Sequence, residues 1–220
     1  IIPPREVALE EGVRRVHSDL VEYLQSRGDI PAEVSITISG AADQLDATQE
    51  ALVGNYLVAL FIVYLLMVAI FNHWGYPLLI MTSLPVGVAG GLLGLALLNT
   101  VVSQPFDMIS MLGFLILMGT VVNNPILVVH RAVENFNAGS EARDAVREAI
   151  QTRLRPIAMS TITTLCGLAP LVLIPGAGTE LYRGVGVIVM FGILGAMLVT
   201  LTMLPALTTL VLQWQEARRK

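Results

Sequence analysis

Polar side chains that could do chemistry interrupt two otherwise apolar stretches of the sequence. Asn123, Asn124 and Pro125 lie in one stretch, and Ser160 and Thr164 lie in another. Ser160 and Thr164 are four residues apart, so they share one face of a helix. Amide and hydroxyl groups donate and accept hydrogen bonds without gaining or losing charge at neutral pH. The spacing therefore predicts a hydrogen-bonded contact between two helices, with Asn123 or Asn124 facing the hydroxyl groups.

Two interpretations of this contact stay open. Polar side chains that bridge membrane helices stabilise their packing by about 0.6–2 kcal/mol, so the residues can be structural. Polar groups in the hydrocarbon layer are also costly and often mark transport pathways, so they can belong to a relay. Pro125 has no amide proton and leaves the carbonyl group of Val121 without its helical partner, which a nearby Asn amide could bind.

The elements that must position these residues are five long apolar stretches. A helix needs about 20 apolar residues to cross the hydrocarbon layer. The five stretches contain a single formal charge, Asp107, and the whole chain has 14% charged residues and a mean hydropathy of +0.72. The sequence therefore predicts an all-α polytopic membrane bundle of five transmembrane helices. The stretches are Val53–Phe71, Tyr76–Leu98, Phe106–Val129, Ile157–Pro175 and Val185–Leu212.

Glycines four residues apart recur in the second stretch, and the fifth pairs a glycine with an alanine at the same spacing. Small residues at this spacing let helix backbones approach closely. We expect tight helix packing there, with mobility along a smooth helix face as the alternative. The candidate packing residues are Gly87, Gly90, Gly91, Gly94 and Gly192.

The distribution of basic residues predicts which side of the membrane each loop faces. Lys and Arg accumulate in cytoplasmic loops. The loop after the third stretch and the C-terminal tail together carry eight of them, whereas the opposite loops carry only Arg183. The tail, 215–220, is therefore predicted to be cytoplasmic, and residues 1–52 to be external. The eight basic residues are Arg131, Arg143, Arg147, Arg153, Arg155, Arg218, Arg219 and Lys220.

The polar N-terminal part predicts a domain that this chain does not complete. Helical periodicity over residues 6–27 and alternation over residues 34–39 predict one helix and one strand, which cannot bury a core alone. We expect residues 1–45 to end an external α+β domain, and residues 46–214 to form the membrane region. Exporting such a segment needs an upstream element, so we expect the C-terminal piece of a longer protein. A short protein with a removed signal peptide is the alternative.

The loop between the third and fourth stretches predicts a further helix. Near residues 140–152, apolar side chains recur on one face and charged side chains cover the other, which is typical of an amphipathic helix lying along a membrane surface. Ser140 is its candidate N-cap.

The sequence lacks the residue patterns of several functional classes. The sequence has no nucleophile–base set, phosphate-binding loop, metal-ligand spacing or basic aromatic patch, so we expect no enzyme, cofactor, metal site or nucleic-acid partner. No Asp, Glu, Lys or Arg lies at mid-depth in any apolar stretch. If the protein is a proton-driven carrier, its main protonating residue therefore lies outside this chain.

Five runs of sequence are distinctive when taken in order. They are ISGAADQLDATQ at 38–49, PVGVAGGLLG at 85–94, GFLILMGTVVNNPILVVHRA at 113–132, AVREAIQTRLRPIAMSTITTLCGLAPL at 145–171 and TMLPAL at 202–207. Together they resemble the C-terminal end of resistance–nodulation–division (RND) efflux permeases of the multidrug and hydrophobe exporter branch, and the third and fourth runs are the most specific.

The resemblance implies a homotrimeric antiporter of the bacterial inner membrane, with residues 1–52 periplasmic and the chain forming the eighth to twelfth transmembrane helices. Such permeases work with a periplasmic adaptor and an outer-membrane channel, and they exchange protons for exported compounds. Other readings of the same scaffold are a membrane assembly or sensing module and a half-permease that needs a partner chain.

The resemblance also implies roles for single residues. In much-studied drug pumps, a lysine at the position of Asn123 pairs with two aspartates of the fourth helix, which this chain lacks. Asn124 matches the neighbouring asparagine, Arg153 an arginine at the cytoplasmic mouth of the proton path, and Ser160 a threonine beside the aspartates. With Thr164, which shares the face of Ser160, these are the relay candidates. Asn123 cannot form the lysine's salt bridge.

Overall fold

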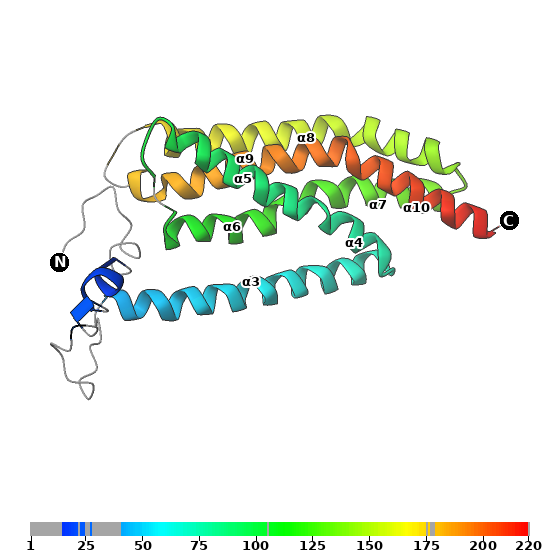
Figure 1. Ribbon diagram of the computed structural model, residues 1–220. Helices are drawn as coiled ribbons and strands as arrows, with labels where there is room; N and C mark the ends of the chain where they lie inside the picture. The colour runs from blue at the N-terminus through cyan, green and yellow to red at the C-terminus, as the bar shows by residue number, and fades with distance from the viewer. Residues whose placement is uncertain are drawn as a thin grey trace.

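The computed structural model describes residues 15–21, 23–24, 27, 41–104, 106–174, 176 and 179–219, whose regular elements are all helices. They form an elongated bundle (Figure 1). A π-helical turn, η1, spans His17–Val21. The α-helices are α3 (Ala41–Phe71), α4 (Gly75–Met81), α5 (Ser83–Asn99), α6 (Met108–Val121), α7 (Asn123–Asn137), α8 (Ala142–Leu173), α9 (Thr179–Leu201) and α10 (Met203–Arg219).

Five helical segments are long and apolar enough to cross a membrane, as the sequence predicts. Helix α3 begins at Ala41, twelve residues before the first apolar stretch. Of the predicted helix at 6–27, residues 15–21 and 23–24 are described and are helical. The predicted strand at 34–39 lies outside the described residues, so the α+β segment stays a prediction.

Prolines divide three of the five crossings. In each of the three, the first helix ends the same number of residues before the proline. A proline lacks an amide proton and its ring crowds the carbonyl group four residues earlier. Helices α4, α6 and α9 end four residues before Pro85, Pro125 and Pro205, respectively. The second, third and fifth crossings are therefore each two helices joined at one residue. Pro156 and Pro170 lie within α8 without dividing it.

The predicted amphipathic helix near 140–152 is not a separate element. It forms the first turns of α8, which continues without a break into the fourth apolar stretch. Its apolar face is buried, and the α7 side chain Asn135 donates a hydrogen bond to the carbonyl oxygen of Ala145 (3.3 Å). The prediction of a short helix lying along the membrane was wrong, because this face packs against α7. Ser140 is not the N-cap, a position that Glu141 occupies without a side-chain hydrogen bond.

Helix α9 lies at the centre of the bundle, where it contacts α5, α6, α7, α8 and α10. The closest approach is to α5 and depends on glycines of both helices. A Cβ atom built on Gly90 would lie 2.7 Å from the carbonyl oxygen of Phe191, and one on Gly192 would lie 3.0 Å from the carbonyl oxygen of Gly87. All five glycines that the sequence singles out lie at this contact, and their role in packing stays a prediction.

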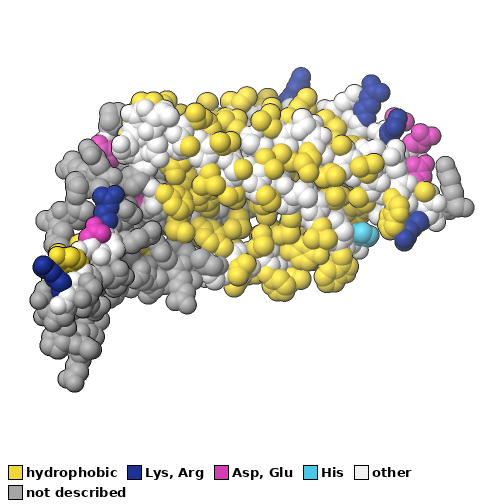
Figure 2. Space-filling view, in the orientation of Figure 1, with side chains coloured by type: hydrophobic (Ala, Val, Ile, Leu, Met, Phe, Trp, Pro, Cys, Tyr) yellow, Lys and Arg dark blue, Asp and Glu magenta, His cyan; other side chains and the backbone are white. Residues whose placement is uncertain are grey.

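Helix α3 lies at the edge of the bundle (Figure 1) and packs mainly against α4 and α6. The Tyr56 hydroxyl group of α3 donates a hydrogen bond to the carbonyl oxygen of Met111 in α6. Much of the apolar surface of α3 is exposed, including Leu57, Phe61 and Leu66. Figure 2 shows hydrophobic side chains over the middle of the molecule, with charged side chains mainly toward its ends. This distribution suits a membrane-spanning bundle.

The connections between crossings fall into two groups. The α3–α4 turn, the α7–α8 turn and the C-terminus lie at one end of the bundle, and the α5–α6 and α8–α9 connections lie at the other (Figure 1). The loops that the sequence predicts on one side of the membrane are therefore gathered together. Which side that end faces stays a prediction.

We predict that Gly90→Ala destabilises the protein. The added methyl group would meet backbone atoms of α9 that cannot move aside, and overpacking of this kind costs about 1–3 kcal/mol. Gly167→Ala is the matched control, because nothing lies within 4 Å of its added Cβ atom and alanine favours a helix. Thermal unfolding in detergent should show a lower midpoint for Gly90→Ala only. Equal midpoints would mean that the two helices do not pack this closely.

Candidate functional site

A cavity of about 330 Å³ opens where α6 meets α7, on the side that faces α8. The α6–α7 break at Val122 forms part of its wall. Most of the relay candidates from the sequence line it, together with one residue of α9. The lining residues are Gly119, Thr120, Val122, Asn123, Asn124, Ile126, Ser160, Thr161, Thr164 and Ile193.

The predicted contact between the asparagines and the hydroxyl face of α8 is present, and Asn124 makes it. The Ser160 hydroxyl group lies 3.5 Å from Oδ1 of Asn124, at the outer limit of a hydrogen bond, and 3.0 Å from the carbonyl oxygen of Ile157. Thr164 donates to the carbonyl oxygen of Ser160 (2.9 Å). Asn123 lines the cavity but is exposed on the surface of this chain. The two asparagines therefore have different surroundings.

Thr161 is a further polar residue of the cavity that the sequence reasoning did not select. Its side chain is 2% exposed, and its hydroxyl group has no hydrogen-bond partner among the described residues. A buried hydroxyl group without a partner costs about 1–3 kcal/mol. The signal was its spacing, because Thr161 and Thr164 are three residues apart and share a helix face. Thr120 of α6 also lines the cavity, but its hydroxyl group is bound to carbonyl groups of its own helix.

Arg153 does not line the cavity. It lies seven residues before Ser160 on α8, which is roughly 10 Å along the helix axis toward the end that holds the C-terminus. Its Nε atom is buried and has no partner among the described residues. The structure therefore brings Asn123, Asn124, Ser160 and Thr164 together and places Arg153 apart from them.

The chemistry available in the cavity is hydrogen bonding without proton binding. None of its ten lining residues titrates near neutral pH, so none can carry a proton as a charged intermediate. Their amide and hydroxyl groups can orient a carboxyl group or hold water, because the cavity is polar and has room for several water molecules. The site can therefore position a proton-binding group but cannot replace it.

Comparison with known proteins identifies the family. Residues 11–212 match the AcrB/AcrD/AcrF family, which is more than half of the chain. The chain belongs to this family of RND permeases. Two curated relatives are multidrug resistance proteins MdtC. The protein from Pantoea ananatis is 33% identical over 214 residues, covering 96% of this chain and 20% of the relative. The protein from Photorhabdus laumondii is 36% identical over 177 residues, covering 80% of this chain and 17% of the relative.

A solved structure has the same fold as this chain. It is the crystal structure of a heavy metal efflux pump, which matches with a TM-score of 0.68 and 26% identity. The match covers 87% of this chain and 19% of the pump chain. The chain spans about a fifth of the length of these relatives, so the activity, substrates and partners of a whole permease are matters for proposal.

We predict that Thr161→Val raises the thermal stability of the chain. Valine fills nearly the same volume and removes a buried hydroxyl group that lacks a partner. Thr200→Val is the matched control, since Thr200 is fully buried but donates to the carbonyl oxygen of Ala196 (2.7 Å). We expect Thr200→Val to lower the free energy of unfolding by about 1 kcal/mol, because it removes this hydrogen bond. A larger loss in Thr161→Val than in Thr200→Val would show that the Thr161 hydroxyl group is bound in the folded protein.

Proposed function

We propose that this chain is part of a bacterial inner-membrane permease that exports drugs or other hydrophobic compounds in exchange for protons. The single observation that carries the proposal is the polar cavity between α6, α7 and α8. It gathers Asn123, Asn124 and Ser160, three of the four residues that match relay positions, in a chain of the RND permease family. The MdtC relatives are named for multidrug resistance, which supports drugs as the exported compounds.

In this proposal the cavity holds carboxyl groups supplied from outside the chain. Asn123 is exposed on this chain, so its amide group is free to face another helix of the permease. An amide NH₂ group donates to a carboxylate, and its oxygen accepts from a protonated carboxyl group. Asn123 can therefore pair with both protonation states. An ammonium group would favour the carboxylate more strongly than a neutral amide does, so this site holds its proton more tightly than a lysine-containing site.

The partners follow from the same family membership. We propose a homotrimer in the inner membrane that works with a periplasmic adaptor and an outer-membrane channel. Arg153, which lies toward the end with the C-terminus, would be the first polar group of the path from the cytoplasm. The rest of the permease, including its porter domain, would complete the external segment at residues 1–45.

The proposal predicts that Asn123→Leu abolishes efflux in the complete permease while the protein level stays normal. Leucine is favoured in the membrane core, so insertion should not suffer. If Asn123 only stabilises helix packing, the substitution should lower the stability of the permease by about 0.6 kcal/mol and efflux should survive. Asn55→Leu is the control, because Asn55 is exposed on α3 and does not line the cavity. The measurement is substrate efflux normalised to inserted protein. Efflux near the wild-type level in Asn123→Leu would remove Asn123 from the mechanism.

The proposed orientation is tested by labelling single cysteines. In a Cys166→Ala background, we expect a membrane-impermeant maleimide to label Val101→Cys from the periplasm. Ala138→Cys should react only after the inner membrane is opened. Both positions are exposed, and they lie at opposite ends of the bundle. The opposite labelling pattern would refute the periplasmic assignment of residues 1–52 and the cytoplasmic assignment of the tail.

A further inference from the structure

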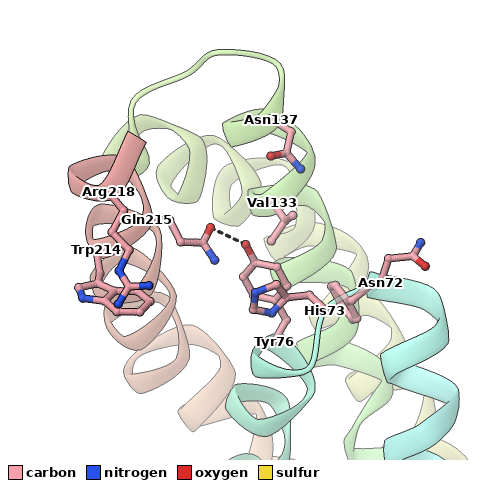
Figure 3. A pocket seen from close by; sticks show the side chains of 9 residues that line it. Asn72, His73, Tyr76, Val133, Asn137, Trp214, Gln215 and Arg218 are labelled. Carbon is pink, nitrogen blue, oxygen red and sulfur yellow. Dashed lines mark hydrogen bonds between the residues drawn. The ribbon is translucent and has the colours of Figure 1, made fainter. Parts of the chain in front are cut away.

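An open pocket of about 470 Å³ lies between α4, α7 and α10, at the end of the bundle that holds the C-terminus (Figure 3). It is separate from the cavity described above and shares no residue with it. Aromatic and apolar side chains form much of its wall, and several polar groups lie among them. The lining residues are Phe71, Asn72, His73, Tyr76, Val133, Asn137, Trp214, Gln215 and Arg218.

The hydrogen bonds of the pocket leave donors available. The Tyr76 hydroxyl group donates to Oε1 of Gln215 (2.8 Å), so the Gln215 NH₂ group can donate elsewhere (Figure 3). The backbone N–H of Gly75 donates to Nδ1 of His73 (2.9 Å), which places the proton of the neutral ring on Nε2. The guanidinium group of Arg218 lies over the Trp214 ring, 3.7 Å from its centre. This stacking holds the cation beside the pocket while its N–H groups stay available.

The charge of the pocket favours an anion. Arg218 is the only residue with a formal charge among the nine that line it, and none of the nine is an Asp or Glu. Glu134 of α7 forms an ion pair with Arg131 (2.9 Å) and does not line the pocket. A planar guanidinium group with nearby amide and imidazole donors matches the geometry of a phosphate group.

The position of the pocket indicates where that phosphate group comes from. Trp74 and Trp214 are exposed at the same end of the bundle, and tryptophans with this exposure are typical of the boundary between hydrocarbon and headgroups. Phe71 and Val133 offer apolar walls beside the polar donors. Basic pockets between transmembrane helices bind the headgroups of anionic lipids. We propose that this pocket binds the phosphate-containing headgroup of an anionic phospholipid, with Arg218 as its principal contact.

The test is lipid binding by the complete protein, purified in detergent and followed by native mass spectrometry. Phosphatidylglycerol and cardiolipin should bind about tenfold more tightly than phosphatidylcholine, which carries a phosphate group but no net charge. Arg218→Gln should weaken the binding of the anionic lipids about tenfold, as expected for the loss of hydrogen bonds to a charged group. Arg218→Lys should bind the anionic lipids with an affinity between those of the wild type and Arg218→Gln, because it keeps the charge but loses the planar group that stacks on Trp214.

The control is Arg143→Gln, which removes an exposed arginine of α8 that does not line the pocket. It should change binding by less than twofold. Circular dichroism checks that Arg218→Gln is folded, which we expect because the side chain is exposed near the end of α10. Equal binding of charged and neutral lipids would overturn the proposal, as would equal effects of Arg218→Gln and Arg143→Gln. Inorganic phosphate that binds as well as the anionic lipids would assign the pocket to a soluble anion and overturn the lipid assignment.

Discussion

The backbones of α5 and α9 approach so closely at their glycines that Cβ atoms at the central positions would meet carbonyl groups of the facing helix. In a membrane, apolar surfaces gain little from leaving lipid, so close packing supplies much of the force between helices. This contact places α9 at the centre, where Leu117 of α6 packs against Gly192. Because α9 is held there, its residue Ile193 lines the polar cavity. The arrangement of the site therefore depends on a contact in which glycine backbones meet.

The prolines explain why the cavity lies where it does. Pro125 ends α6 at Val121, so the helix is interrupted just before the two asparagines. The same break occurs before Pro85 and Pro205, but only the junction at Val122 has amide side chains beside it and the α8 hydroxyl face opposite. The break before Pro125 lies beside a cavity lined by residues of α6, α7, α8 and α9, and membrane proteins tolerate broken helices where protein or water covers the backbone.

Hydropathy and helical spacing predicted the five crossings and a contact of Asn123 or Asn124 with the hydroxyl face of the fourth, because both depend on local periodicity. Only the structure shows that Asn124 makes the contact with Ser160. The same information could not show which prolines divide a helix. Pro156 and Pro170 look like Pro85 in the sequence, yet α8 is continuous, since the outcome depends on what packs around each ring. The amphipathic pattern near residue 145 correctly predicted a helix with one apolar face. It did not predict that α7 covers this face, because periodicity identifies an apolar face without saying whether lipid or protein covers it. Thr161 was missed because its burial depends on neighbouring helices.

The continuity of α8 makes it longer than the hydrocarbon layer is thick. Its 32 residues make a rod of about 48 Å, whereas the hydrocarbon layer is about 30 Å thick. The N-terminal end of α8 contacts α7 in two ways. Asn135 donates a hydrogen bond to it, and a guanidinium nitrogen of Arg131 lies 3.9 Å from the carboxylate of Glu148. Helix α7 contacts this unbroken helix at two places, at Ala145 through Asn135 and at Ser160 through Asn124. The outer turns of α8 and the polar cavity are therefore parts of one continuous helical element.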